Sequence, residues 1–333
     1  GPTINWLVGA NGAGKTTVLE AAHILSHGRS FRAGGRSAPC RHGAQEFTIH
    51  AELRCQEAHR LGVTRRDERW QARLDGADLF SLAPLFEVCP VVCFGPESLS
   101  LILGAAEERR NFLDWSVFHV EHESLDVWRR WRRALRQRNA LLRAAAADAL
   151  FEPWEHDLGL LADRIHRMRG DCLASLEPYL AEEATWLVPE LGALQVTYRP
   201  GWDETTGLAV ELASHRQRDR ERGFTQRGPH RADWMLHFTE VAQREHLSRG
   251  QAKAIALVCV LAQARWLKDR VGEFPLLCLD DLQSELDDAH AGKVVAWLAD
   301  KPIQSWMTAT MEPSRHGHEA RVFHVEHTGL TPT

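Results

Sequence analysis

The pattern of apolar and polar residues predicts an α/β fold. Near the start of the chain, the apolar run at 3–8 (TINWLV) is typical of a buried strand, and positions 17–25 fit a helix. Near the end, the short apolar run at 275–279 again fits a buried parallel strand, and 252–266 fit an apolar helix. Strands that alternate with helices in this way indicate a parallel sheet covered by helices.

The loop between the first strand and the first helix has the sequence GANGAGKT at positions 9–16, which matches the phosphate-binding pattern G-x-x-x-x-G-K-[ST]. Glycines let the backbone point N–H groups at phosphate oxygens, and the following helix adds its positive dipole end. Lys15 would reach the β and γ phosphates, and the Thr16 hydroxyl would bind Mg²⁺. The pattern predicts ATP and Mg²⁺ as cofactors, with contacts from Gly9, Asn11, Gly12, Gly14, Lys15, Thr16 and Thr17.

A second candidate motif follows the late strand, where positions 275–287 read PLLCLDDLQSELD. Two carboxylates at the end of a buried parallel strand lie at the sheet edge where nucleotides bind. We expect Asp280 to hold the metal, directly or through water, and Asp281 to act as a general base or to position water. The alternative is a strand end followed by a helix that Ser284, Glu285 or Asp287 caps.

The sequence LSRGQ at 247–251 opens the apolar helix, so Ser248 and Gly250 occupy a helix N-terminus, a position that favours anions. Together with the two motifs above, this segment resembles the ABC/SMC ATPase family, whose LSxGQ signature contacts the γ-phosphate bound to the opposite subunit. The resemblance implies an ATP-induced homodimer. It assigns Ser248, Gly250 and Gln251 to the partner's nucleotide, and SELD at 284–287 to the D-loop at the same interface.

The separation along the sequence between Lys15 and Ser248 is longer than in the family's transporter subunits and shorter than in SMC proteins with their coiled coils. This spacing is similar to that of the RecF family. Further stretches that resemble this family are HGRSFR at 27–32, FGPESLSLI at 94–102, RRNFLDWSVFHVEH at 109–122, GPHRAD at 228–233 and VFHVEH at 322–327.

The RecF resemblance implies a weak, DNA-linked ATPase that binds single- and double-stranded DNA at single-strand gaps. It also implies action with RecR and RecO, and indirectly with RecA, in recombinational repair and replication. An ABC-type transporter subunit is the alternative. Because the family has further strands before the first one seen here, we expect a segment upstream of Gly1. Thr308 or Thr310, or less suitably His316, falls where transporters have a switch histidine, and the loop at Pro96 and Glu97 is where they have a metal-shell glutamine.

An arginine-rich stretch lies between the motifs, at 129–143 (RRWRRALRQRNALLR). It has seven arginines and no acid, with Trp128, Trp131, Leu135 and Leu142 at helical spacing. A helix with one basic side would bind DNA phosphates without reading base sequence; the alternative is a solvated helix face. The predicted DNA contacts are Arg129, Arg130, Arg132, Arg133 and Arg136. A second basic cluster, diluted by Asp219 and Glu221, contains Arg216, Arg218, Arg220, Arg222, Arg227 and Arg231.

The amino-acid composition narrows the possible classes of protein further. The net charge of −5 excludes a uniformly basic nucleic-acid binder. Seven cysteines without metal-ligand or redox spacing indicate reduced thiols in a cytoplasmic protein. Without an apolar run of about eighteen residues, we expect no membrane span. The repeated VFHVEH could bind metal through its histidines, but a structural role is favoured.

The order of the motifs predicts the domain organisation. Because the phosphate-binding loop and the LSRGQ-to-aspartate region must share one nucleotide, residues 1–103 and 226–333 should fold together as an α/β head. Residues 104–225 should form an inserted, mainly helical lobe. The predicted fold class is therefore an ABC/SMC-type ATPase head with an inserted helical lobe.

Overall fold

The computed structural model describes residues 3–32, 40, 43–54, 57–66, 69–242, 246–312, 320–326 and 329–332. The chain divides into two compact units. Unit 1 comprises Gly1–Ile102 and Leu247–Thr333, and unit 2 comprises Leu103–His246. None of the helices in the described part of the chain has the length and apolar character that crossing a bilayer requires.

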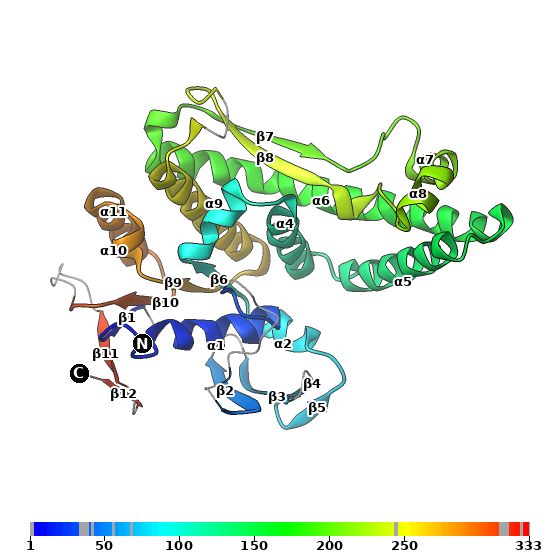
Figure 1. The fold of residues 1–333 in the computed structure, drawn as a ribbon. Helices are drawn as coiled ribbons and strands as arrows, with labels where there is room; N and C mark the ends of the chain where they lie inside the picture. The colour runs from blue at the N-terminus through cyan, green and yellow to red at the C-terminus, as the bar shows by residue number, and fades with distance from the viewer. Residues whose placement is uncertain are drawn as a thin grey trace. The chain divides into compact units, whose positions relative to one another are not determined.

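The main sheet of unit 1 is six-stranded, in the order β12-β11-β1-β10-β9-β6 (Figure 1). All neighbouring strands in it are parallel except β11 and β12, which are antiparallel. Its strands come from both ends of the chain, so the carboxyl ends of early and late strands share one edge. Their bounds are β1 Ile4–Val8, β6 Val91–Phe94, β9 Leu276–Leu279, β10 Ser305–Ala309, β11 Arg321–Glu326 and β12 Gly329–Pro332.

A second, antiparallel sheet of four strands also belongs to unit 1. Along its strands exposed and less exposed residues alternate, as expected for a sheet with one solvated face. Leu61, Val63 and Ala72 on its inner face form one buried cluster with Leu19 and Leu25 of helix α1. The elements are β2 Glu46–Arg54, β3 Ala58–Arg66, β4 Arg69–Leu74, β5 Ala77–Leu79, α1 Lys15–His27 and α2 Ala83–Val88.

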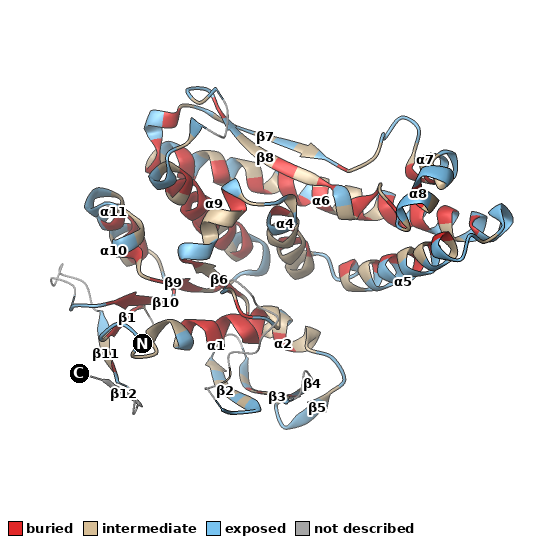
Figure 2. Ribbon diagram, viewed as in Figure 1, coloured by how far each residue is buried: buried red, intermediate tan, exposed pale blue. Residues whose placement is uncertain are grey.

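Helix α9, Arg249–Val271, is a largely buried helix of unit 1. Every residue from 254 to 264 is buried (Figure 2). A helix that is apolar on all sides is a core helix, which explains the uninterrupted apolar stretch in the sequence. The remaining helices of unit 1 are short: η1 Pro96–Ser98, α3 Leu99–Leu103, α10 Leu282–Glu285 and α11 Asp288–Ala299, of which α3 ends at the unit boundary.

Unit 2 is mainly helical, with one β-hairpin. Val127 and Trp131 of α5 pack against Leu158, Leu161 and Ile165 of α6 in its core. The elements are α4 Ala106–Val120, α5 Ser124–Arg143, η2 Asp148–Leu150, α6 Glu152–Leu187, η3 Pro189–Leu191, β7 Leu194–Arg199, α7 Leu208–Ser214, α8 Arg216–Arg222, η4 Pro229–Arg231 and β8 Asp233–Phe238. The predicted fold class, an α/β head with an inserted helical lobe, is confirmed.

One predicted boundary differs from the structure. Residues 226–246, expected in the head, lie in unit 2. Strand β8 pairs antiparallel with β7, and the carboxylate of Asp233 receives two hydrogen bonds from Arg109, at 2.7 and 3.0 Å. Both partners of this segment are in unit 2, so the hairpin and the ion pair together hold it there.

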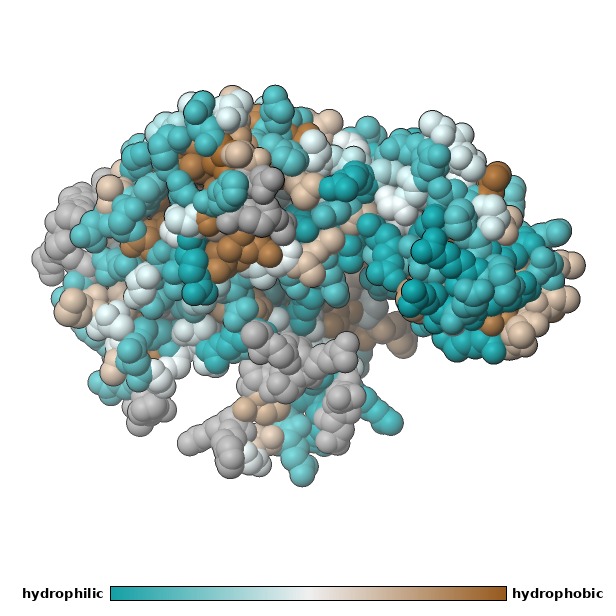
Figure 3. All heavy atoms as spheres, turned by 45° about the horizontal axis from the view of Figure 1, so that its top comes forward, coloured by the Kyte–Doolittle hydropathy of each residue, from teal (hydrophilic) through white to brown (hydrophobic). Residues whose placement is uncertain are grey.

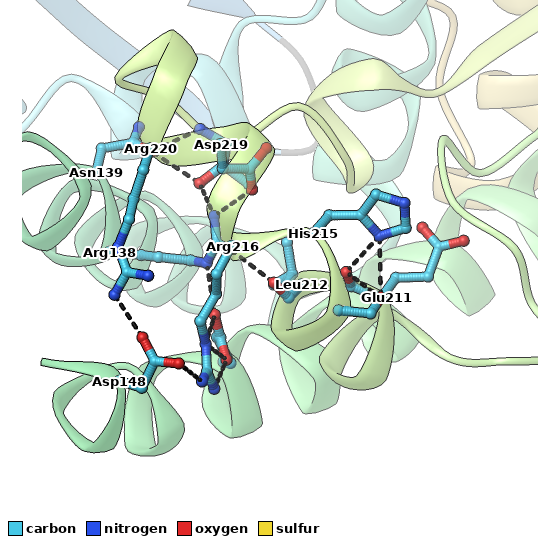
Figure 4. Close-up of polar contacts among 12 residues, drawn as sticks. Arg138, Asn139, Asp148, Glu211, Leu212, His215, Arg216, Asp219 and Arg220 are labelled. Atoms are coloured by element: carbon cyan, nitrogen blue, oxygen red, sulfur yellow. Dashed lines mark hydrogen bonds and ion pairs between the residues drawn. The ribbon is translucent and has the colours of Figure 1, made fainter. Parts of the chain in front are cut away.

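A buried ionic cluster, which we call the arginine hub, joins α5, α6 and α8 (Figure 4). The Arg138 side chain is fully buried and pairs with Glu155 at 3.1 Å and with Asp219 at 2.7 Å. It also donates to the Thr225 hydroxyl at 2.8 Å and to the carbonyl oxygen of Leu212 at 2.9 Å. Buried charges persist when they are paired in this way, because an isolated one would lose its hydration.

The hub extends to two arginines of α8. Arg216 pairs with Glu155, and Asp148 lies between the guanidinium groups of Arg216 and Arg220 (Figure 4). The buried ring of Phe151 lies 5.2–6.0 Å from all three hub guanidinium carbons, within cation–π range. These three arginines are therefore structural, and they are distinct from the arginines of α5 that were predicted to contact DNA.

We predict that Arg138→Met lowers the free energy of unfolding by about 3–5 kcal/mol, because it leaves Glu155 and Asp219 buried without their partner. Urea unfolding of the full chain measures the change. The matched control is Arg136→Met, which removes an exposed arginine from the same helix and should change stability by less than about 0.5 kcal/mol. Equal losses in the two variants would contradict the structural role of the hub.

Candidate nucleotide-binding site

The loop between β1 and α1 has a backbone that its glycines alone allow. A Cβ atom on Gly9 would lie 2.4 Å from the carbonyl oxygen of Val325 in β11, so no side chain fits there. Gly14 caps α1 with a φ of 104°, in the left-handed region that glycine adopts at no steric cost. The chain can therefore turn sharply from the buried strand into the helix.

Lys15 folds over this loop. Its ammonium group donates to the carbonyl oxygens of Gly9 at 2.8 Å and Ala10 at 3.0 Å. The first N–H groups of a helix have no acceptor within it, and the helix dipole places partial positive charge at the same point. The loop thus presents an ammonium group and backbone donors together, with Asn11, Gly12 and Thr17 exposed to solvent. This arrangement fits phosphate.

The predicted metal ligands lie together although they are far apart in sequence. The Thr16 hydroxyl donates to Oδ1 of Asp280, at an oxygen–oxygen distance of 3.0 Å. Neighbouring ligands of an octahedral Mg²⁺ with bonds of about 2.1 Å have about this separation. Asp280 follows β9 and is 5% exposed, so its carboxylate is fixed. The two oxygens therefore fit a magnesium site.

Thr308, near the end of β10, links the two aspartates. Its hydroxyl donates to Oδ1 of Asp280 at 2.8 Å and accepts from the backbone N–H of Asp281 at 2.7 Å. Of the candidates for the switch position, Thr308 is thus the residue that touches the site. Thr310 is exposed, and His316 lies outside the described residues.

Asp281 is held by its backbone while its carboxylate remains available. Its φ of 52° is unusual for an aspartate and turns the chain at the end of β9. Within the described part of the chain, the carboxylate accepts no hydrogen bond. A carboxylate beside a metal position can orient water or accept a proton.

The loop after β6 approaches the same carboxylates. A Cβ atom on Gly95 would lie 3.2 Å from the Asp280 Cβ, and the Phe94 carbonyl accepts from the Asp280 N–H at 2.7 Å. Pro96 and Glu97 are exposed beyond it. Since β6 neighbours β9, this loop lies at the edge where the metal ligands meet.

Ser248 and Gln251 form a reciprocal capping box at the start of α9. The Ser248 hydroxyl accepts from the Gln251 N–H at 3.1 Å, and the Gln251 side chain accepts from the Ser248 N–H at 2.9 Å. Ser248 and Gly250 are exposed, and no hydrogen bond among the described residues joins 247–251 to the loop at 9–17. The LSRGQ segment therefore forms a capped helix N-terminus that is exposed to solvent.

The sequence analysis missed Lys253. Its ammonium group lies 2.9 Å from Oε2 of Glu285 in α10, and thus joins α9 to the predicted D-loop. Lys253 is the only charged residue between Gly250 and Arg265, which is a signal that could have identified it. After α10, Asp287 caps α11 by accepting from the His290 N–H at 2.9 Å, so the capping alternative also holds.

The basic side of α5 is present in unit 2. Val127, Trp131 and Leu142 face the core, whereas the predicted DNA contacts face solvent. Figure 3 shows hydrophilic side chains gathered over the end of unit 2 that contains α5, α7 and α8. The exposed arginines without an ion-pair partner among the described residues include Arg129, Arg130, Arg132, Arg133 and Arg136.

The GPHRAD segment forms a turn with an ion pair. Asp233 pairs with Arg109, and Arg231 lies over the ring of Phe224 at 5.6 Å. His230 hydrogen-bonds the Thr225 carbonyl, and burial lowers its pKa to about 4. His230 is therefore neutral at pH 7 and contributes no charge to DNA binding.

The repeated hexapeptide VFHVEH has two conformations. The first copy overlaps the end of α4, and the second begins in β11, with its last residue outside the described part. Burial lowers the pKa of His119 to about 4, and His324 lies 3.4 Å from Glu312. No group of three potential metal ligands from His, Cys, Asp and Glu occurs among the described residues.

Comparisons with known proteins agree with this architecture. The family described as the RecF/RecN/SMC N terminal domain matches residues 1–327. A protein named DNA replication and repair protein RecF, from Xanthomonas euvesicatoria pv. vesicatoria, is 42% identical over 339 residues, covering 99% of this chain and 92% of the relative.

Two solved structures share the fold. The recombination mediator protein RecF with ATP, at 23% identity, has a TM-score of 0.89 over 100% of this chain and 92% of its own. The Smc head domain of Pyrococcus furiosus, at 12% identity, has a TM-score of 0.54 over 100% of this chain and 90% of its own.

The fold and its motifs define a head of the SMC class. Within that class, the chain belongs to the RecF family of DNA replication and repair proteins. The resemblance predicted from the sequence is confirmed, and the membership favours it over the alternative of a transporter subunit.

We predict that Thr308→Val lowers the free energy of unfolding by about 1–3 kcal/mol. The near-isosteric change leaves the part-buried N–H of Asp281 without its acceptor and removes a buried donor to Asp280. Urea unfolding measures the loss. Thr48→Val is the control, because it removes a hydroxyl bonded to Thr64 on an exposed surface, and a change within about 0.5 kcal/mol is expected. Equal stability of wild type and Thr308→Val would refute the bridging role.

Proposed function

We propose that this chain is a cytoplasmic, ATP-dependent DNA-binding protein of recombinational repair and replication. It dimerises on ATP at single-strand gaps, hydrolyses ATP slowly, and helps RecO and RecR to load RecA. The observation that carries this proposal is the contact between the Thr16 hydroxyl and Asp280, which joins the phosphate-binding loop to the paired aspartates.

The residues at this contact suit ATP and Mg²⁺. Lys15 and the N–H groups at the start of α1 bind the phosphates, and Thr16 and Asp280 hold the metal. Bound Mg²⁺ neutralises phosphate charge. The Asp281 carboxylate orients the attacking water and accepts its proton. Thr308 fixes the positions of Asp280 and Asp281 relative to each other through its hydrogen bonds to both.

The exposed start of α9 suits a second copy of the chain. Ser248 and Gly250 point their helix end to solvent, so it is available to a γ-phosphate held by a partner. ATP then favours the closed dimer, because its γ-phosphate contacts both chains only in that state, and hydrolysis removes this difference. Gln251 contributes by fixing Ser248 in the capping box.

Exposed arginines of α5 supply the DNA contact, namely Arg129, Arg130, Arg132, Arg133 and Arg136. They carry positive charge that no acid among the described residues neutralises. Such a surface attracts the phosphate backbone of single or double strands and carries no base specificity. The names of the relatives, which place them in DNA replication, repair and the RecFOR pathway, support DNA, RecO and RecR as partners.

The first test is duplex DNA binding by the chain with ATP, ADP or no nucleotide. We expect ATP to tighten binding about tenfold or more, in the usual range of coupling between sites. Lys15→Met should abolish the gain by removing the phosphate contact, and Ser248→Arg by blocking the dimer. The control Lys301→Met, a lysine that lies over Trp297, should retain it. DNA binding that is indifferent to ATP in the wild type would contradict the proposal.

A second test concerns the arginines of α5. Replacing Arg129, Arg132, Arg133 and Arg136 together by Gln should weaken DNA binding and flatten its dependence on salt. Each lost phosphate contact changes the slope of log K against log salt by about 0.9 for duplex DNA. The control variant, with an equal loss of charge on exposed residues of unit 1, replaces Arg54, Arg60, Arg66 and Arg69. The same slope in both variants would exclude α5 as the DNA surface.

A further inference from the structure

We infer that Phe224 and Arg231 of unit 2 form a stacking platform for an unpaired base of single-stranded DNA. The inference rests on the proposed DNA binding and deepens it, because the phosphate contacts proposed for α5 are available from a duplex and from a single strand alike. The platform supplies a part of the affinity that only unpaired bases provide.

The ring of Phe224 is exposed although it lies beside the buried arginine hub. Its exposed fraction is 41%. The residue before it, Gly223, ends α8 with a φ of 76°, and its N–H donates to the carbonyl oxygen of Asp219 at 2.8 Å. A glycine in this left-handed conformation turns the chain out of the helix, so the direction of the backbone is fixed immediately before the ring.

The residue after the ring, Thr225, is anchored in the interior and is only 2% exposed. Its N–H and its hydroxyl both donate to the side-chain oxygen of Asn139, at 2.9 and 2.7 Å. Its hydroxyl accepts from Arg138 at 2.8 Å, and its carbonyl oxygen bonds to the ring of His230 at 3.0 Å. Because the residues on both sides are fixed, Phe224 keeps its ring at the surface.

Arg231 completes the platform. Its guanidinium carbon lies 5.6 Å from the centre of the Phe224 ring, and the residue is exposed. Its N–H donates to the carbonyl oxygen of Gly228 at 2.8 Å, and a Cβ on Gly228 would lie 2.9 Å from the ring of the buried Trp131. The turn that carries Arg231 is therefore pressed against the core. A planar guanidinium stacks on bases as well as on aromatic rings, so the platform is flat, cationic and preorganised.

Exposed positive charge lies next to the platform. On α5, Asn139 is one helical turn from Arg136 and one turn from Arg143, so the three share a face. Both arginines are exposed, and neither pairs with an acid in the described part of the chain. A Cβ on Gly223 would lie 3.8 Å from Cγ of Arg143, so this arginine reaches the residue before the ring. A strand held by its phosphates at these arginines can place a base on Phe224.

The chemistry of the platform selects single strands. In a duplex the faces of the bases are covered by their neighbours, whereas an unpaired base can turn its face onto an aromatic ring. Every base has such a face, so the contact requires no particular sequence. A single-strand gap contains duplex and unpaired bases side by side. The arginines of α5 and the ring of Phe224 can then bind the same DNA molecule.

The first experiment measures the affinity of the full chain, with ATP, for a labelled oligothymidylate by fluorescence anisotropy. Phe224→Ala should weaken binding at least about fivefold, the range for the loss of one stacked base. Phe224→Trp keeps a planar ring and should retain the affinity. The matched control Phe80→Ala removes an exposed ring from unit 1 and should have no effect. Affinity for duplex DNA should be unchanged in all three variants.

The second experiment separates stacking from charge and from folding. An abasic strand of the same length has the same phosphates and no bases. The wild-type chain should bind it at least about fivefold more weakly than oligothymidylate, and in Phe224→Ala this ratio should fall to about one. Arg231→Lys keeps the charge but not the planar group, so it should lower the ratio. Because the ratio compares two ligands on the same folded protein, a loss of stability in a variant does not change it.

A wild-type ratio of one, or the same ratio in wild type and Phe224→Ala, would overturn the inference and leave the proposed function standing, since ATP-dependent duplex binding does not need the platform. Absence of binding to every DNA in the wild type is a different result, because it refutes the proposed function and the inference with it.

Discussion

The parallel pairing of β1, β10 and β9 is the constraint on which the rest of the structure depends. Parallel strands end at one sheet edge, so this pairing brings Thr16, Thr308 and Asp280 within hydrogen-bonding distance. The strands come from opposite ends of the sequence, and all of unit 2 lies between them. The site therefore exists only when a long-range topology has formed, and the loop by itself supplies only half of it.

How far the sequence predicts such a molecule depends on the range of each interaction. The phosphate-binding loop and the helix cap at Ser248 are local, and the sequence predicted both. Whether an arginine of α5 is buried depends on residues that are distant in sequence. Arg136 is exposed and Arg138 is buried in the same helix, because Glu155 and Asp219 pair only with Arg138. The hexapeptide VFHVEH, helical once and extended once, likewise shows tertiary context deciding local structure.

The boundary of unit 2 and the ion pair of Lys253 were missed for the same reason. Pairing of β8 with β7 is invisible until the hairpin is known, and a lysine in an apolar helix has no evident purpose until Glu285 is placed beside it. By contrast, the identity of the family followed from the order and spacing of several motifs along the sequence. The order of motifs can be read directly from the sequence, whereas contacts between side chains cannot.

The two kinds of arginine in α5 respond differently to ions. Mobile salt reaches the exposed side and screens charges beyond about 10 Å at 0.1 M, whereas the centre of the hub, where Arg138 pairs with Glu155 and Asp219, is buried away from it. Raising the ionic strength can thus release a ligand bound to the basic side of α5, while the buried ion pairs that join α5, α6 and α8 stay intact. Helix α5 thereby combines a surface whose electrostatic binding is reversible with buried ion pairs that dissolved salt does not disrupt.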